Sequence, residues 1–458
     1  MLAKKLVLIV IDGLTPAVLE QAVEERTAPT LAFLADSGDY RRAVTTFPSL
    51  TPVCLSSLAT GAHPDVHHIP HLVWYHAGER RLVEYGSSFG AIRAAGTAQS
   101  IRDAIFNLNA HHLSRESVTV FESLDDAGFE TAAVNMVCYR GRNLHRATLP
   151  GLSRSVQGPR RFFYFNLFES DVTGAPLAVR TRSRGSVDEY AARVGRWLVT
   201  RDGFDFFLFY LPDYDFASHV NGPDGAHAAL ARADRAVGAL LEAAGGPDEF
   251  LERYAVLLCS DHGQTNVTEA VRLEDAFPEF TLLRPGRERA QLVVTASNRA
   301  GMVYLLPGAA VGPGDLAHRL ERAAGVEVVL YREDGEAVAR RRGEEVRFAP
   351  SDGGFSVRGD EALLAYPDAL ERAWSALANP NAGDLIVSAT PGFEFVDLGG
   401  RHHAGGGSHG SLETGDSEVP MLAVGLDPPD RLIEVAPTVL RHFGVEPPPY
   451  ARRPVRVT

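Results

Sequence analysis

The sequence is poor in cysteine, with three among 458 residues (Cys54, Cys138 and Cys259) and no C-x-x-C pair. A disulfide framework is therefore not expected, and a reducing compartment is the simpler interpretation. No segment approaches the roughly 18 continuous apolar residues of a membrane span. The apolar run Leu6–Ile11 is too short for the core of a signal peptide, and it ends at Asp12-Gly13 rather than at a cleavage site. We expect a soluble, cytoplasmic protein that does not bind membranes.

Positive charge is also scarce, because 45 Lys and Arg residues stand against 58 Asp and Glu residues, a formal net charge of −13. Binding to a nucleic-acid backbone needs clustered Lys and Arg, so stable nucleic-acid binding is not expected. An anionic substrate is not excluded, since bound divalent cations reverse the local field at a site made of carboxylates. The hydrophobic content of 45% is typical of globular proteins that bury a large core.

Apolar, β-branched runs alternate with helical patterns along much of the chain. Strands are expected at Leu6–Ile11, Glu130–Val137, Phe204–Tyr210, Tyr254–Cys259 and Met421–Gly425. Helices are expected at Val120–Ala127, Asp188–Val199 and Ala226–Ala244, the last two with a 3.6-residue apolar period. Strands that are apolar on both faces and alternate with helices predict an α/β fold, with a mostly parallel central sheet sandwiched by helices.

The pattern changes between about Phe280 and Phe395. Strand-like runs at 291–295 and 302–306 precede a helix at 315–324, a further strand at 326–331 and an arginine-rich hairpin. This order predicts a small α+β cap, residues 281–395, inserted into a metal-binding catalytic α/β domain made of residues 1–280 and 396–458. Substrate-binding segments vary most among proteins, so the cap is expected to carry most of the specificity.

Acidic and histidine residues follow two of the expected strands directly. Asp12 ends the first strand, and Asp261-His262 come just after the strand Tyr254–Cys259. Ligands of open α/β sheets gather outside the carboxyl ends of the strands, which favours a metal site here. A turn or helix-capping role is the alternative for Asp12, because Asp is a preferred N-cap residue.

Two further candidate ligands, Asp215 and His219, follow the strand Phe204–Tyr210. Their spacing of four on a helical turn puts the carboxylate and the imidazole on one face, where both can bind one ion. Asp213 is a rival carboxylate at a less favourable spacing from His219. His409 lies in the glycine-rich segment Gly405–Gly410, where glycines allow close approach of the backbone. Solvated polar residues are the alternative interpretation at each of these positions.

Thr51 precedes Pro52 at the start of an apolar helix that is expected to stop at Gly61. Threonine is a good N-cap, proline a good first helical residue and glycine a good terminator. The pattern places a hydroxyl at the positive end of a helix dipole, where free N–H groups favour a phosphate. An ordinary cap would look the same, whereas a nearby metal that lowers the pKa of the hydroxyl would make it a nucleophile.

Taken in chain order, the motifs are I-D-G, F-P-x-x-T, D-x-x-x-H-x-x-G-P, S-D-H-G and G-x-H-G. This order resembles the alkaline phosphatase superfamily, and most of all its nucleotide pyrophosphatase/phosphodiesterase branch. The resemblance implies that one metal is held by Asp215, His219 and His409. The other would be held by Asp12, Asp261 and His262, with the hydroxyl of Thr51 as a further ligand. It also implies two divalent ions, Zn²⁺ or alternatively Mn²⁺, and the mixed carboxylate and imidazole donors suit zinc.

The chemistry implied by the resemblance is two-metal hydrolysis of a phosphate ester. Thr51 would attack phosphorus, and water would then hydrolyse the phospho-threonine, with net retention at phosphorus. The expected substrate is a small phosphorylated molecule such as a nucleotide, cleaved by a phosphodiesterase or nucleotide pyrophosphatase activity.

The sequence departs from the family at one position. Family phosphodiesterases place a phosphate-binding asparagine downstream of the nucleophile, whereas the corresponding stretch here, Ile69–Tyr75, contains none. His71 and Tyr75 are therefore the candidate substrate-binding residues.

Two other functions compete with the phosphodiesterase. A phosphomonoesterase or a phosphonate hydrolase of the phosphonoacetate type would need cationic groups for the extra charge, for which Arg140 and Arg142 are candidates. A sulfatase is disfavoured because the C/S-x-P-x-R pattern is absent. A catalytically inactive metal- or ligand-binding homologue is the alternative from another class. The loss of a ligand or of the nucleophile would mark that case, and all seven positions hold competent residues.

Overall fold

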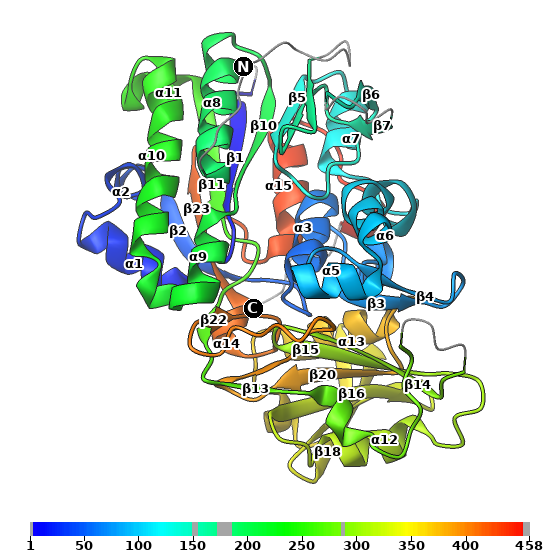
Figure 1. Cartoon of the computed structure of the whole chain (residues 1–458). Helices are drawn as coiled ribbons and strands as arrows, with labels where there is room; N and C mark the ends of the chain where they lie inside the picture. Colours follow the sequence, from blue (N-terminus) through cyan, green and yellow to red (C-terminus); the bar gives the residue numbers. More distant parts are fainter. Residues whose placement is uncertain (1–2, 149–153, 172–185, 285–288, 452–458) are drawn as a thin grey trace.

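The computed structural model describes residues 3–148, 154–171, 186–284 and 289–451. Two large β-sheets dominate it, one of eight strands and one of seven. Figure 1 shows the eight-stranded sheet with its helices in the upper part of the molecule and the seven-stranded sheet below it. Within the described ranges, no helix combines the length and the apolar character that crossing a membrane requires.

The eight-stranded sheet has a parallel centre and antiparallel edges. In spatial order its strands are β2 (Asp39–Val44), β23 (Glu418–Val424), β11 (Tyr254–Cys259), β1 (Lys5–Ile11), β10 (Phe206–Leu211), β5 (Thr131–Val134), β8 (Arg161–Tyr164) and β9 (Phe168–Ser170). The strands from β11 to β8 pair in parallel, whereas β23 and β9 run antiparallel to their neighbours. The predicted α/β fold class is confirmed.

Helices cover both faces of this sheet, and the side chains of β1 alternate between them. Val7, Ile9 and Ile11 are buried against one set of helices, and Leu6, Leu8 and Val10 are buried against the other. The first set comprises α1 (Pro16–Glu24), α2 (Pro29–Asp36), α8 (Val187–Thr200), α10 (His227–Ala244) and α11 (Pro247–Arg253). The second comprises α3 (Thr51–Thr60), α7 (Val120–Asp126) and α15 (Val435–His442). Burial on both faces explains why the central strands are continuously apolar.

The seven-stranded sheet is antiparallel throughout. Its spatial order is β14 (Leu292–Ser297), β15 (Ala300–Leu305), β20 (Leu385–Ala389), β16 (Val326–Glu333), β17 (Glu336–Arg341), β18 (Glu344–Ser351) and β19 (Gly354–Gly359). Helices α12 (Pro313–Leu320) and α13 (Ala369–Ala378) pack into two separate apolar clusters of this sheet. All these elements lie inside the range 281–395. The division of the chain into a cap and a catalytic domain stays a prediction.

Shorter elements lie between the strands and helices of the large sheets. They include α9 (Asp213–Asn221), α4 (Pro64–His67), α5 (Phe89–Ala95), α6 (Thr97–Arg102), the π-helical segment Asp103–His112 and the hairpins β3–β4 (Val73–His76, Arg81–Glu84) and β6–β7 (Asn143–Arg146, Ser155–Gly158). Of these, α9 matters most for the site because it follows β10 at the carboxyl edge of the parallel strands.

Candidate metal centre

The three central strands end level with one another, and this brings their C-terminal residues together. The register pairs Ile11 of β1 with Leu211 of β10, and Val10 of β1 with Cys259 of β11. Asp12 therefore emerges beside the residues that follow β11 and β10. The predicted gathering of polar side chains at the carboxyl edge of the sheet follows from this shared register.

The first cluster consists of Asp12, Asp261 and His262, which are all buried and offer ligand atoms within 4.8 Å of one another. His262 Nε2 lies 3.3 Å from Asp12 Oδ1 and 3.5 Å from Asp261 Oδ2. Neither of these two oxygens has a hydrogen-bond partner among the described residues. Buried carboxylate oxygens without donors are costly, and a bound cation is the group that would satisfy them.

The second cluster consists of Asp215 and His219 from α9 together with His409, again with ligand atoms within 4.8 Å of one another. His219 Nε2 lies 3.3 Å from Asp215 Oδ2, and His409 Nε2 lies 3.8 Å from Asp215 Oδ1. The rings of His262 and His409 stack with centroids 3.6 Å apart, so the two clusters adjoin.

The backbone fixes which nitrogen of each histidine is available to a metal. The Nδ1 atoms of His219, His262 and His409 lie 2.8, 3.0 and 2.8 Å from the carbonyl oxygens of Gly407, Gly263 and Ser49. A carbonyl oxygen can only accept, so each Nδ1 carries the proton and donates it. Each Nε2 then points to its cluster, where it can give its lone pair to a bound cation, the arrangement in which metal-ligating histidines are held.

Charge is crowded at this edge of the sheet. Burial, reinforced by Asp12, raises the pKa of Asp261 well above its usual range. Burial opposes protonation of His262, but Asp261 and Asp12 outweigh it and raise the pKa of the imidazole to about 10. Without a cation, these buried carboxylates must take up protons or pair with a charged histidine. A divalent cation would neutralise them instead, and the carboxylate and imidazole donors suit zinc.

Thr51 is the first residue of α3, whereas the sequence predicts it to be the N-cap. Leu50 occupies the N-cap position, and Gly61 ends the helix with φ of 69°, as expected for a terminating glycine. The shift by one residue leaves the Thr51 hydroxyl free of a capping role. Its Oγ1 lies 3.1 Å from Nε2 of His262.

Glycines bring the chain segments close enough to form the second cluster. A side chain at Gly406 would overlap the main-chain carbonyl of His219. Gly13 has φ of 70°, and a β-carbon there would lie 2.8 Å from Asp215 Oδ1. Any other residue at either position would displace a candidate ligand.

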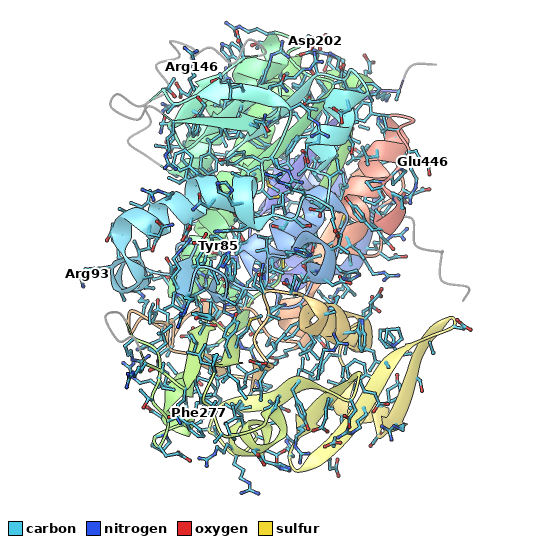
Figure 2. The ribbon with its side chains drawn as sticks, turned by 90° about the vertical axis from the view of Figure 1, so that its right-hand side faces the viewer. Tyr85, Arg93, Arg146, Asp202, Phe277 and Glu446 are labelled. Carbon is cyan, nitrogen blue, oxygen red and sulfur yellow. The ribbon has the colours of Figure 1, made fainter. Side chains whose placement is uncertain are left out.

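Both clusters open into one cavity of about 780 Å³, which Asp12, Thr51, Asp215, His219 and His409 help to line. Aromatic and aliphatic side chains form much of the remaining wall: Leu72, Tyr85, Phe89, Tyr164, Phe165, Phe216 and Val220. Figure 2 labels Tyr85 near the middle of the molecule, above the seven-stranded sheet. Phe89, Phe216 and Val220 are 92%, 59% and 64% exposed, so apolar surface faces solvent at this cavity.

The structure does not bring the predicted substrate-binding residues to this cavity. His71 is fully buried, its Nδ1 accepts from the backbone N–H of Val73 at 3.1 Å, and burial lowers its pKa to about 4. Tyr75 is almost completely buried and packs edge-on against Tyr304. Tyr75 belongs to the apolar cluster that packs between the seven-stranded sheet and α13.

The charged residues predicted as alternatives form contacts outside the two clusters. Arg140 and Arg142 bind Glu122 at 3.1 and 2.9 Å and line a different cavity. The carboxylate of Asp213 accepts from the backbone N–H groups of Val187 and Asp188, both at 3.2 Å, and so holds the start of α8.

Three side chains at the site are not predicted from the sequence. Tyr210 donates to Asp12 Oδ2, and Gln264 donates to Asp215 Oδ1. Asn298, from the turn between β14 and β15, lies with its Nδ2 atom 2.8 Å from His409 Nε2. Gln264 directly follows the S-D-H-G motif, a signal that could have identified it. The sequence gives no comparable signal for Asn298, which is far from the other site residues along the chain.

The sequence profile of the type I phosphodiesterase / nucleotide pyrophosphatase family matches residues 6–412, and the chain belongs to this family. Membership places it in the alkaline phosphatase superfamily and indicates a phosphoester hydrolase. No curated protein sequence matches the chain significantly.

Solved structures of the same fold include murine ectonucleotide pyrophosphatase / phosphodiesterase 5, with a TM-score of 0.62 and 11% identity. Phosphonoacetate hydrolase from Sinorhizobium meliloti 1021, in complex with phosphonoformate, aligns with a TM-score of 0.61 and 17% identity. In both cases 97% of this chain and 96% of the other chain are covered.

Proposed function

We propose that this protein is a zinc-dependent phosphodiesterase in which Thr51 is the nucleophile. Asp215, His219 and His409 would hold one ion, and Asp12, Asp261 and His262 would hold the other. The two ions, when bound, would lower the pKa of the threonine hydroxyl and stabilise charge on the attacking and leaving oxygens. We further propose that residues 281–395 act as a cap beside this site.

The position of the Thr51 hydroxyl is the main observation in support of the proposal. It lies at the first turn of a buried helix, on the wall of the cavity and 3.1 Å from a candidate ligand of the first cluster. Pro52, the second residue of α3, has no N–H, and the N–H groups of Val53 and Cys54 both donate to the carbonyl oxygen of Leu50 at 2.9 Å. A phosphoryl group attacked by Thr51 would therefore be stabilised by the positive end of the helix dipole rather than by a set of free backbone donors.

The proposed reaction has two displacements at phosphorus. In the first, the Thr51 Oγ–P bond forms, the P–O bond to the leaving group breaks, and the departing oxygen keeps the electron pair and takes a proton. In the second, a water oxygen bonds to phosphorus, the Oγ–P bond breaks, and Thr51 regains its proton. Two inversions give net retention, which a chiral phosphorothioate diester would report.

The character of the cavity supports a diester over a monoester. Arg401 is the one Lys or Arg side chain among its described lining residues, and Arg140 and Arg142 lie elsewhere. A monoester dianion carries one more negative charge at phosphorus than a diester and would gain more from cationic partners. The exposed apolar side chains at Phe89, Phe216 and Val220 would instead bind the second ester group.

The test compares substrates on the zinc-loaded protein. Hydrolysis of bis-(p-nitrophenyl) phosphate, p-nitrophenyl phosphate and phosphonoacetate would be followed for the wild type beside Thr51→Ala. We expect kcat/KM to be highest for the diester and to be lost in the variant. Monoester or phosphonate turnover that is faster by orders of magnitude would reject the diesterase and favour the corresponding hydrolase. No turnover of any substrate would favour the inactive homologue.

A further inference from the structure

Asn298 brings an uncharged hydrogen-bond donor from the second sheet into the candidate metal centre. It lies in the two-residue turn between β14 and β15, is 6% exposed and lines the cavity. Its Nδ2 atom lies 2.8 Å from Nε2 of His409, a ligand atom of the second cluster. The β14–β15 hairpin therefore places an amide beside the position that an ion bound by His409 would occupy.

The orientation of the amide is fixed by its neighbour. The hydroxyl of Ser297 lies 3.3 Å from Oδ1 of Asn298 and donates to it. With the amide oxygen engaged by a donor, the NH₂ group is the end that faces His409. This group therefore directs an N–H bond toward the cluster.

The backbone of the turn is tied to the same loop that carries His409. The N–H of Arg299 donates to the carbonyl oxygen of His409 at 2.8 Å. The carbonyl oxygen of Asn298 accepts from the N–H of Phe395 at 2.7 Å. Arg299 itself is fully buried and forms ion pairs with Glu413 and with Asp416, the latter at 2.8 Å. The amide is consequently held at a set distance from His409.

The contact between Asn298 and His409 has a chemical consequence. His409 donates through Nδ1 to Ser49, so its Nε2 atom carries the lone pair that now faces the asparagine amide. If His409 gave this lone pair to a bound cation, Asn298 would lose its acceptor. An N–H bond would then be left without that partner in a nearly buried position, a condition that proteins avoid. A substrate oxygen at this cluster would satisfy it.

We infer that Asn298 is a catalytic residue whose Nδ2 donates to a non-bridging phosphoryl oxygen of the substrate at the Asp215, His219 and His409 cluster. The inference rests on the proposed phosphoester hydrolysis and deepens it. An amide does not titrate, so its hydrogen bond to the phosphoryl group persists across the working pH range. The same donor would bind the phosphate product.

A simpler role for Asn298 is to form the turn, since its φ is 56° and asparagine tolerates this conformation. Glycine tolerates the conformation as well, so Asn298→Gly keeps the turn and removes only the amide. Asn298→Asp keeps the shape and replaces the donor by an acceptor. Asp334, exposed with φ of 50° in the turn between β16 and β17, provides the matched control Asp334→Gly.

The decisive measurement is binding of inorganic phosphate to the zinc-loaded full chain by isothermal titration calorimetry, with zinc content measured on the same samples. We expect Asn298→Gly to keep its zinc and to bind phosphate at least about tenfold more weakly, with a larger loss in Asn298→Asp. For the diester, kcat/KM should fall about a hundredfold, as for the removal of one oxyanion donor. Asp334→Gly should match the wild type in all three measurements.

Phosphate affinity in Asn298→Gly within twofold of the wild type would overturn the inference. It would also be overturned if zinc were lost and saturating zinc restored phosphate binding, because Asn298 would then only position His409. Failure of the proposed function looks different. In that case the wild type would not cleave diesters, although phosphate binding could still depend on Asn298.

Discussion

The hydroxyl of Thr51 and the Nε2 atom of His262 lie 3.1 Å apart, which joins the first turn of α3 to the end of β11. Helix α3 is buried along its length, from Pro52 to Thr60, and β11 is buried at every residue. Neither element can move without disturbing the core on one face of the large sheet. The hydroxyl is therefore held in place relative to the two clusters of candidate ligands by the packing on this face of the sheet.

Replacing Thr51 tests its role as nucleophile. Thr51→Val keeps the shape of the side chain and should lower kcat on the diester by at least about a thousandfold, since no competent nucleophile remains. Thr51→Ser retains a hydroxyl and should keep measurable activity. Circular dichroism and thermal unfolding would check that both variants fold. Activity of Thr51→Val within tenfold of the wild type would show that another group attacks phosphorus.

The two clusters should lose their ions independently. His219→Gln removes a ligand from one cluster and Asp12→Asn weakens the other, so each variant should carry about one zinc ion where the wild type carries about two. Metal analysis after gel filtration would give the stoichiometry. His318→Gln, a change at a half-exposed histidine on α12, is the control and should leave the zinc content unchanged. Full occupancy in both ligand variants would contradict the proposed ligand sets.

Asp188 should make stability depend on pH. Burial, together with the neighbouring Asp213, raises the pKa of Asp188 to about 8. Its carboxyl group binds a proton more tightly in the folded than in the unfolded chain. Stability should therefore fall as pH rises from about 4 toward 8, by at most about 1.4 kcal/mol per pH unit.

The variant Asp188→Asn should remove this dependence, because the amide is neutral and its oxygen can still accept from the N–H of Asp213. Urea unfolding of both proteins at pH 5, 6, 7 and 8 would measure it. We expect the variant to gain stability relative to the wild type as pH rises. Parallel pH profiles would mean that Asp188 is ionised in the folded protein.

Arg299 should be essential for stability because it is fully buried between two carboxylates. Arg299→Met would leave Glu413 and the fully buried Asp416 without their cation, at a cost of about 3–5 kcal/mol. Arg358 pairs with Glu336 through a side chain that is 65% exposed, so Arg358→Met should cost at most about 1 kcal/mol. Chemical denaturation would compare the two variants. Equal losses would mean that the ion pairs of Arg299 with Glu413 and Asp416 stabilise the fold no more than an exposed pair does.

The central strands and the candidate ligands could be predicted because their signals are local. The runs at β1, β10 and β11 are apolar on both faces, and Asp12, Asp215 and His262 follow them at short range. Strand β2 gave no such signal, because it is an edge strand and its sequence, Asp39–Val44, is largely polar.

Asn298 could not be predicted as a candidate site residue, since its contact with His409 exists only in the folded chain. His71 is the opposite case, because it is predicted to contact substrate and does not reach the cavity. Its place downstream of Thr51 suggested a substrate contact, but the segment that follows α4 turns inward and buries the imidazole. In both cases tertiary packing, rather than local pattern, decided which side chain reached the cavity.

The place of β23 in the large sheet has a consequence for biosynthesis. This strand comes late in the chain but lies between β2 and β11, so the sheet has a gap until residue 424 has left the ribosome. His409 emerges only shortly before it. We expect nascent chains arrested before residue 409 to hold no ion at Asp215 and to expose unpaired strand edges, which a chaperone must shield. Metal binding at the cluster of Asp215, His219 and His409 would then require that the segment carrying His409 has been synthesised.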